Sequence, residues 1–230
     1  PYLDKNKTGL TSRSSNITDG ELKLIAPKYI APETPALIRV NARNATKLYL
    51  KIFNIDHPEK HSAELKLPPS TNYRVKEIPL KQVICNLPAH NDFREHYYEV
   101  SLPPLPVGTY DIYADDGPQD RWRREPDWGF ASFTVTDIGY IMDNQHPGRL
   151  YLKSRSSGAA LEGIEVRAYW AKKDADGREY NEQYLVTHSG KDGIVEFSIE
   201  DLKKHHTTVS LSDGKDKIFV DGRVFYDGKH

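Results

Sequence analysis

The single cysteine of the chain, Cys85, is the first side chain to test for chemistry, because a thiolate can attack a carbon centre or bind a metal. It lies in the segment 83–88, VICNLP, where apolar residues alternate along the chain. This pattern predicts a buried, unreactive thiol in a strand. The sequence holds no Gly-x-Ser-x-Gly, and one cysteine can form neither an intrachain disulfide nor a Cys-based metal site.

Histidines are the next candidates for metal binding or proton transfer. Six of the nine form three pairs: His57 with His61, His90 with His96, and His205 with His206. Pro58 breaks the helix that would place His57 and His61 on one face, and neighbouring side chains of a strand point to opposite faces, as His205 and His206 would. No pair has the spacing of a structural zinc site. We therefore predict no catalytic residue and no metal ligand in this chain.

Two loops rich in Asp and Gly could offer oxygen ligands to calcium, residues 173–177 (KDADG) and 191–193 (KDG). A full calcium site needs about 6 to 8 oxygen ligands, and each loop supplies only one or two carboxylates. Asp-Gly is also a preferred hairpin turn. We interpret both loops as turns. No Gly-rich loop between a strand and a helix is present to hold a nucleotide, so no cofactor is expected.

The segment 121–128, RWRREPDW, has the most unusual composition of the chain. Two Trp side chains among three Arg side chains could stack on a sugar, a peptide or a protein surface. The residues proposed for this interaction surface are Trp122, Arg123, Arg124 and Trp128. The alternative interpretation is structural: the Trp rings cover the open end of a sandwich while the Arg residues pair with nearby acidic residues, namely Asp115, Asp116 and Asp120.

Alternation of apolar and polar residues predicts strands almost throughout, since side chains of a strand face opposite sides in turn. The first series of predicted strands covers residues 21–25, 36–42, 46–55, 97–102, 108–114 and 130–136, with weaker candidates near Tyr73 and at 78–84. In the strand at 46–55, Leu48, Leu50 and Ile52 share one face. Tyr110 follows a Pro-Val-Gly turn, as the corner tyrosine of immunoglobulin-like sandwiches does, and we expect it to be structural.

A second series begins after the strand pattern stops near Asp137 and Gly139. Its predicted strands cover residues 149–153, 165–170, 183–188, 194–199, 207–211 and 217–220, and a short polar helical turn is expected at 199–204. The predicted fold class is all-β, with two tandem β-sandwiches of the immunoglobulin or fibronectin III type. The predicted domains are a flexible segment at 1–20, a first sandwich at 21–137 and a second at 138–230.

Charge and hydrophobicity exclude several classes of partner. Lys and Arg number 32, Asp and Glu 33, and the formal net charge is −1, with no basic stretch that could follow a phosphate backbone. We expect no nucleic-acid partner. No apolar run approaches the roughly 18 residues of a membrane helix, so we expect no membrane insertion. The chain begins with Pro1 and without a signal peptide, and we expect it to be a segment of a longer protein.

Five stretches resemble the bacterial alpha-2-macroglobulin-like family, in particular the consecutive macroglobulin modules of its amino-terminal half. Residues 35–53, PALIRVNARNATKLYLKIF, look like a strand pair with an R-N step before a K-L-Y strand, and residues 98–110, YEVSLPPLPVGTY, resemble the L-P-x-G-x-Y end of that module. Residues 133–138, FTVTDI, are similar to the F-x-V-T-D-I crossover into the next module. Residues 150–166 look like V-x-x-x-S-G-x-P-L-x-G-V-x-V, and residues 187–193 resemble T-x-x-D-G.

The resemblance implies a large exported protein that traps proteases, in which a bait segment is cut and a buried thioester is exposed. This chain departs from that pattern, because Cys85 is followed by Asn86 and Leu87 rather than by the Cys-x-Glu-Gln motif, and no bait segment is evident. We therefore expect a non-catalytic scaffold, not an enzyme.

Its implied partners are further macroglobulin modules of the same parent chain and, through the parent, target proteases. The implied location is the periplasm or the bacterial cell surface, with a lipid anchor before the first residue as an open alternative. A second hypothesis is a cell-surface module that binds a glycan, peptide or protein.

Overall fold

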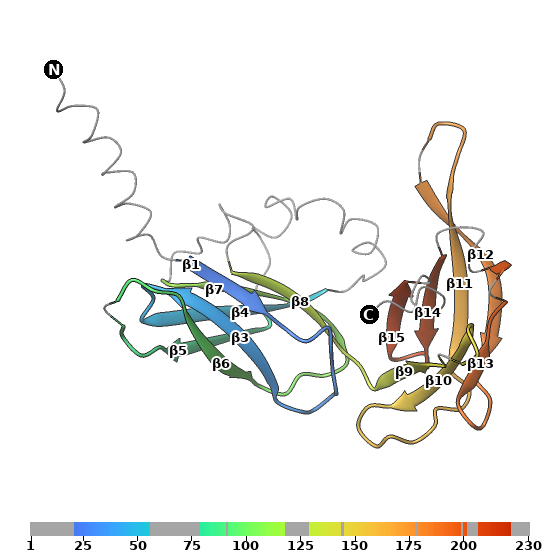
Figure 1. Ribbon diagram of the computed structural model, residues 1–230, viewed down its shortest axis with the longest axis horizontal. Helices are drawn as coiled ribbons and strands as arrows, with labels where there is room; N and C mark the ends of the chain where they lie inside the picture. Colours follow the sequence, from blue (N-terminus) through green and yellow to red (C-terminus); the bar gives the residue numbers. More distant parts are fainter. Residues whose placement is uncertain are drawn as a thin grey trace. The chain divides into compact units, whose positions relative to one another are not determined.

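The computed structural model divides the chain into two compact units (Figure 1). The first consists of residues 1–28, 34–104 and 109–133, and the second of residues 29–33, 105–108 and 134–230. The structure describes residues 21–55, 79–90, 92–117, 129–143, 145–177, 179–198, 200–201 and 207–221. The segment expected at 1–20, the candidate strand near Tyr73 and most of the expected turn at 199–204 lie outside these residues. The domain boundary predicted between 137 and 138 stays a prediction.

All elements with assigned bounds in the described residues are β-strands, which confirms the all-β fold class. Glu200 and Asp201, the described residues of the helical turn expected at 199–204, have helical backbone. In chain order the strands are β1 (Glu21–Ile25), β2 (Tyr29–Ile30), β3 (Ala36–Arg43), β4 (Lys47–Ile55), β5 (Lys81–Asn86), β6 (His96–Leu102), β7 (Gly108–Asp115), β8 (Phe130–Val135), β9 (Ile138–Met142), β10 (Arg149–Ser154), β11 (Glu165–Lys173), β12 (Glu179–His188), β13 (Ile194–Glu196), β14 (Thr207–Ser212) and β15 (Lys217–Asp221).

The first unit is built on two sheets that lie one over the other in Figure 1. One has the order β1-β3-β6, with antiparallel pairing throughout. The other has the order β2-β8-β7-β4-β5, of which β4 and β5 lie wholly in the first unit, as does β7 apart from Gly108. The buried apolar residues of β3, Ile38 and Val40, alternate with exposed ones, as expected of a sheet with one face in a core.

Strand β4 confirms the face predicted from its alternation. Leu48, Leu50 and Ile52 are each 0% exposed. The opposite face of β4 is not entirely polar, because Phe53 is also buried and packs edge-on against Tyr113 of β7, with ring centroids 5.8 Å apart. A small aromatic cluster therefore covers part of the outer face of this sheet.

Tyr110, at the start of β7, confirms the structural role expected of it. It is 0% exposed, and its ring stacks on that of Phe133 with centroids 5.6 Å apart. A buried tyrosine of this kind contributes a large apolar area to the core. It offers no ring surface to a ligand.

The second unit holds two further antiparallel sheets, one with the order β13-β10-β9 and one with the order β12-β11-β14-β15. Both contribute to one core, which makes this unit a sandwich. The buried residues of that core are Ile138, Leu150, Leu152, Ile164, Val166, Ala168, Val195, Phe197, Val209, Leu211, Ile218 and Val220.

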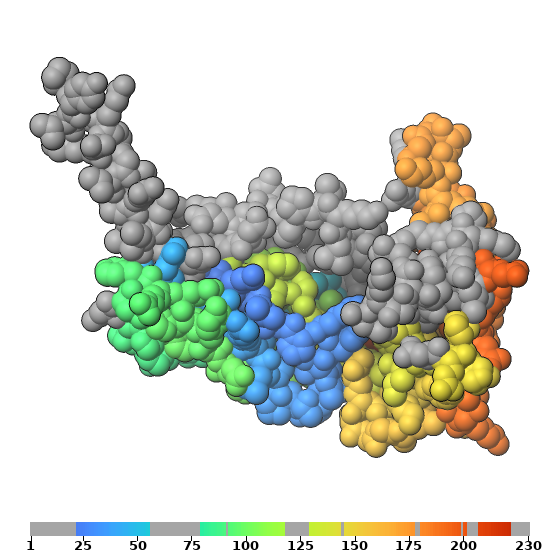
Figure 2. Space-filling model, in the orientation of Figure 1, coloured from blue at the N-terminus to red at the C-terminus, as the bar shows by residue number. Residues whose placement is uncertain are grey.

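Strands β11 and β12 are longer than predicted. Residues Ala171 to Lys173 pair only with β12, because the pairing of β11 with β14 ends at Trp170. The end of this hairpin projects from its unit, as the orange segment in Figures 1 and 2 shows. Stacking of Trp170 on Tyr184 at 4.2 Å and an ion pair of Lys172 with Glu182 stabilise it.

Three further differences concern short strands. Strands β2 and β9 were not predicted, and β13 ends at Glu196 rather than at 199. The ladder keeps one more bond in the same register, from the amide of Phe197 to the carbonyl of Gly148, and it ends there because Gly148 leaves the extended conformation, with a φ of +90°. Among the described residues, no helix is both long and apolar enough to cross a membrane.

Candidate functional site

The interaction surface proposed from the sequence, Trp122, Arg123, Arg124 and Trp128, lies outside the described residues. It stays a prediction. Two of the three histidine pairs, His57 with His61 and His205 with His206, lie outside them as well. The remaining pair, His90 with His96, is described and is brought together.

The two Asp-Gly loops are turns, as predicted. Asp174 accepts a hydrogen bond from the amide of Asp176 at 2.9 Å, and Gly177 has a φ of +79° that favours glycine. In the other loop, the Asp192 carboxylate accepts from the amide of Ile194 at 3.0 Å, and Gly193 has a φ of +74°. The Asp side chains fix the turn backbone, as Asx-turns do, which explains both loops without an ion.

Cys85 lies in β5 opposite Leu48 and is half-buried rather than fully buried. Burial raises the pKa of its thiol. A raised pKa keeps the sulfur protonated at neutral pH and therefore a poor nucleophile. The interpretation of Cys85 as an unreactive thiol is consistent with this environment, although the degree of burial was predicted too high.

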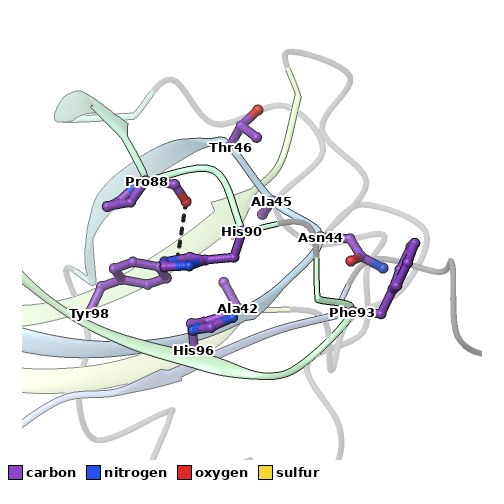
Figure 3. A pocket seen from close by; sticks show the side chains of 9 residues that line it. All are labelled: Ala42, Asn44, Ala45, Thr46, Pro88, His90, Phe93, His96 and Tyr98. Atoms are coloured by element: carbon purple, nitrogen blue, oxygen red, sulfur yellow. Dashed lines mark hydrogen bonds between the residues drawn. The ribbon is translucent and has the colours of Figure 1, made fainter.

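A pocket of about 370 Å³ lies at one end of the first unit, where the connections β3–β4 and β5–β6 meet. The backbone holds these connections together, because the amide of Leu87 donates to the carbonyl of Thr46 at 2.9 Å. Strand β6 supplies one wall, since its pairing with β3 places His96 beside Ala42. The residues that line the pocket are Ala42, Asn44, Ala45, Thr46, Pro88, His90, Phe93, His96 and Tyr98 (Figure 3).

Two histidine rings form the centre of this pocket. His90 and His96 stack with ring centroids 3.8 Å apart and an angle of 13° between their planes. The Nε2 atom of His96 lies 2.9 Å from the Asp92 carboxylate, and this hydrogen bond is the main reason why the pKa of Asp92 is lowered. The imidazole of His96 is therefore held from one side by a carboxylate and from the other by a second ring.

The two ends of the pocket carry different groups. Figure 3 shows Tyr98 at one end, and the Phe93 ring beside the Asn44 side chain at the other. The Tyr98 hydroxyl donates to the carbonyl of Pro88 at 3.4 Å, and burial, with a contribution from the charge of Asp92, raises its pKa. Phe93 is 53% exposed.

The backbone at the Phe93 end is strained. Phe93 and Asn44 both have a φ of +57°, in the left-handed region that a bulky residue such as Phe rarely adopts. Such a conformation costs on the order of 1 kcal/mol or more. The fold therefore holds an exposed aromatic ring at this end of the pocket in spite of a local cost.

The arrangement of the two histidines does not suit a metal ion. Their lone pairs lie in the ring planes, and nearly parallel rings direct them side by side rather than toward one point. One nitrogen of His96 is already bonded to Asp92. Over the part of the chain that the structure describes, no group of three or more His, Cys, Asp or Glu side chains is arranged to hold a metal.

From the sequence, His90 and His96 were candidates for metal binding or proton transfer, and the pocket was not predicted. One signal was available: His96 and Tyr98 are two residues apart in a strand and must share a face. The position of His90 depends on the path of the β5–β6 connection, which no periodicity predicts.

A second polar cluster lies around residues 136–138, which contain the T-D-I of the motif quoted above. The buried carboxylate of Asp216 accepts hydrogen bonds from the Thr136 hydroxyl at 2.9 Å and from the Asp137 amide at 2.8 Å. The Asp137 carboxylate in turn accepts from the amide and the hydroxyl of Ser156 at 2.8 and 2.6 Å. All these groups belong to the second unit, and they hold the beginning of its segment 134–230 against residues later in that segment.

Comparison with known proteins adds a similarity of fold. No protein-family model matches the chain, and no curated protein matches it significantly. A crystal structure of native alpha-2-macroglobulin from Escherichia coli, spanning its domains MG0-NIE-MG1, is similar with a TM-score of 0.52 and 18% identity, over 87% of this chain and 64% of that one. This chain thus spans less than two thirds of the length of that structure.

A structure of trypsin-activated alpha-2-macroglobulin from the same organism is also similar, at 12% identity over 88% of this chain and 15% of that one. Its TM-score of 0.32 is too low to show a shared fold. The first similarity covers most of both units described above. The resemblance seen in the sequence is confirmed at the level of the fold: the chain has the macroglobulin-type β-sandwich fold of bacterial alpha-2-macroglobulin.

Proposed function

We propose that this chain is a non-catalytic scaffold segment of an exported, alpha-2-macroglobulin-like protein that traps proteases. In this role its sandwiches position other segments of the parent, which carry the bait and the covalent capture chemistry. The partners of the chain are further macroglobulin modules, and target proteases meet it only through the parent. The proposed location is the periplasm or the bacterial cell surface.

The observation that carries this proposal is the macroglobulin-type fold over 87% of the chain, combined with the order of the motifs along the sequence. The motif residues that the structure describes have structural tasks. Tyr110 of the L-P-x-G-x-Y motif is fully buried, and Thr136 of the V-T-D-I motif is bonded to Asp216. Residues that serve the core and its connections are what a scaffold requires.

The chemistry of the described side chains supports the same proposal. Covalent capture of a protease needs an activated acyl group or a reactive nucleophile. The thiol of Cys85 has a raised pKa and is not followed by Glu-Gln, so it can neither form the thioester of such a motif nor act as a thiolate near neutral pH.

An inhibition assay tests the scaffold role. The purified chain is incubated with serine, cysteine and metalloproteases, and cleavage of a large protein substrate is followed, because a trap excludes large substrates while leaving the protease active on small ones. We expect full activity on both large and small substrates. Loss of activity on the large substrate alone, caused by this chain by itself, would overturn the passive role.

A further inference from the structure

We propose that the pocket lined by His90, His96, Phe93 and Tyr98 is a binding site for a neutral sugar ring of a glycan. This inference goes beyond the scaffold role. It also differs from the surface around Trp122 and Trp128, because it rests on other residues of the first unit.

The charge of the pocket wall selects the class of ligand. None of the nine lining side chains is Lys, Arg, Asp or Glu. An anionic or cationic ligand would therefore lose hydration without meeting a fixed opposite charge, which is costly. The carboxylate of Asp92 lies outside the lining and is bonded to the ring of His96. A neutral ligand fits this wall better than a charged one.

The groups present match the two kinds of surface that a pyranose offers. Its hydroxyls donate and accept hydrogen bonds, and the pocket supplies the hydroxyl of the exposed Thr46 and the imidazole nitrogens of His90 and His96 other than the one bonded to Asp92. Its C–H face is apolar and slightly positive, and suits the negative face of an aromatic ring. Phe93 presents such a ring at one end of the pocket, with 53% of its surface exposed.

Size and preorganisation support the same occupant. A volume of about 370 Å³ lies near the lower end of the ~300–1,000 Å³ range of ligand pockets and suits one ring rather than a large cofactor. The stacked pair His90–His96 and the bond from His96 to Asp92 fix the ring orientations before any ligand arrives. Fixed side chains lose little entropy when a ligand binds.

The test is an NMR titration of the whole ¹⁵N-labelled chain with glucose, galactose, mannose, N-acetylglucosamine and their short linear oligomers at millimolar concentrations. We expect shift changes at the amides of the pocket residues for at least one of these sugars. The apparent affinity should not change with salt concentration, because no ion pair is involved.

Matched variants locate the binding. Phe93→Ala should weaken it at least fivefold, and Thr46→Val, which replaces the hydroxyl by a methyl group of similar size, should weaken it as well. Ile84→Ala is the control, because Ile84 is equally exposed, at 56%, but lies on β5 outside the pocket. A dispersed spectrum of each variant shows that it is folded.

Three outcomes would overturn the proposal. They are the absence of shifts with every sugar, shifts that remain unchanged in Phe93→Ala, and binding that appears only with N-acetylphenylalanine amide or with acetate. The last two probes stand for a peptide side chain and for an anion. None of these outcomes bears on the scaffold role, which the protease assay tests independently.

Discussion

The hydroxyl of Thr136 donates a 2.9 Å hydrogen bond to the carboxylate of Asp216, which lies 80 residues later in the chain. Both residues are buried, at 0% and 3% exposure. The same carboxylate oxygen accepts from the backbone amide of Asp137. This contact ties the beginning of the segment 134–230 to the turn between β14 and β15, and it explains why a V-T-D-I sequence is useful in a scaffold.

Replacing Asp216 by Ala should therefore destabilise the second unit. The change leaves the buried Thr136 hydroxyl and the partly buried Asp137 amide without this acceptor, and each lost partner of a buried group costs about 1–3 kcal/mol. We expect a loss of about 2–5 kcal/mol in the free energy of unfolding, measured by urea denaturation. A loss of less than about 0.5 kcal/mol, as ordinary surface substitutions cause, would contradict the assigned role.

Asp216→Asn separates charge from hydrogen bonding. Burial raises the pKa of the Asp216 carboxyl above its usual value, so the folded state binds the proton more tightly than the unfolded state. The stability that this proton provides is full below the unfolded pKa, and it is lost as the pH rises through the folded pKa. The variant should therefore gain stability relative to the wild type as the pH rises from about 4 toward neutrality. Urea denaturation at several pH values measures this difference, and a constant difference would contradict the prediction.

Asp143 should stabilise the β9–β10 connection at neutral pH and lose this effect in acid, which is the opposite pH dependence to that of Asp216. Burial opposes its ionisation, but hydrogen bonds from the His146 ring, from the amides of Gln145 and His146 and from the Tyr151 hydroxyl outweigh burial and lower its pKa to about 2. The stability gained is present above the unfolded pKa of 3.8 and is lost as the pH falls toward 2.

The variant Asp143→Ala tests this prediction. We expect it to be less stable than the wild type at neutral pH, with the difference shrinking as the pH falls from 3.8 toward 2. Acid unfolding followed by circular dichroism measures both chains. A difference that stays the same down to the lowest pH would show that the carboxylate charge contributes nothing.

Gly193 should tolerate no side chain. Its φ is +74°, and an added Cβ would lie 2.3 Å from the carbonyl oxygen of Leu152. Gly158 is the matched control, with a φ of +75° and no atom within 4 Å of an added Cβ. Gly158→Ala should cost about 1 kcal/mol from backbone strain alone, whereas Gly193→Ala should cost at least about 2 kcal/mol more. Equal losses in thermal unfolding would contradict the close approach.

Tyr110→Ala tests the core of the first unit. Its ring is fully buried against Phe133, so truncation removes apolar contacts and leaves a cavity. We expect a loss of about 3–5 kcal/mol, measured by urea denaturation. Tyr97→Ala is the control, because Tyr97 is 57% exposed, and its loss should stay below about 1 kcal/mol. Similar losses for both variants would argue against the assigned core.

The strands that could be predicted from the sequence are those with a clear alternation. Strand β4, with Leu48, Leu50 and Ile52, is an example, because half-burial imposes a period of two. Strand β2 has only two residues and pairs in parallel with β8, which no local pattern encodes. Strand β9 was missed because Gly139 interrupts it, and the structure shows why glycine is present: an added Cβ would lie 2.8 Å from the carbonyl oxygen of Lys153.

The candidate sites were harder to predict than the strands. The two loops at Asp174 and Asp192 could be predicted as turns from local sequence, because an Asp side chain forms an Asx-turn by bonding the amide two residues later. The pocket was not, because the stacking of His90 on His96 depends on how the β5–β6 connection folds back over β6. The ends of β11 and β12 were also missed, since their outer part is stabilised by the pair Lys172–Glu182 rather than by apolar alternation.

The nucleotide sequence of the encoding gene on both sides of this segment tests the central claim most directly. The scaffold account predicts further sandwich modules in the same reading frame, together with a protease-sensitive bait segment and a Cys-x-Glu-Gln motif. A reading frame that continues into unrelated domains, or that holds neither a bait segment nor further modules, would contradict the protease-trap function and leave the similarity to alpha-2-macroglobulin as one of fold alone.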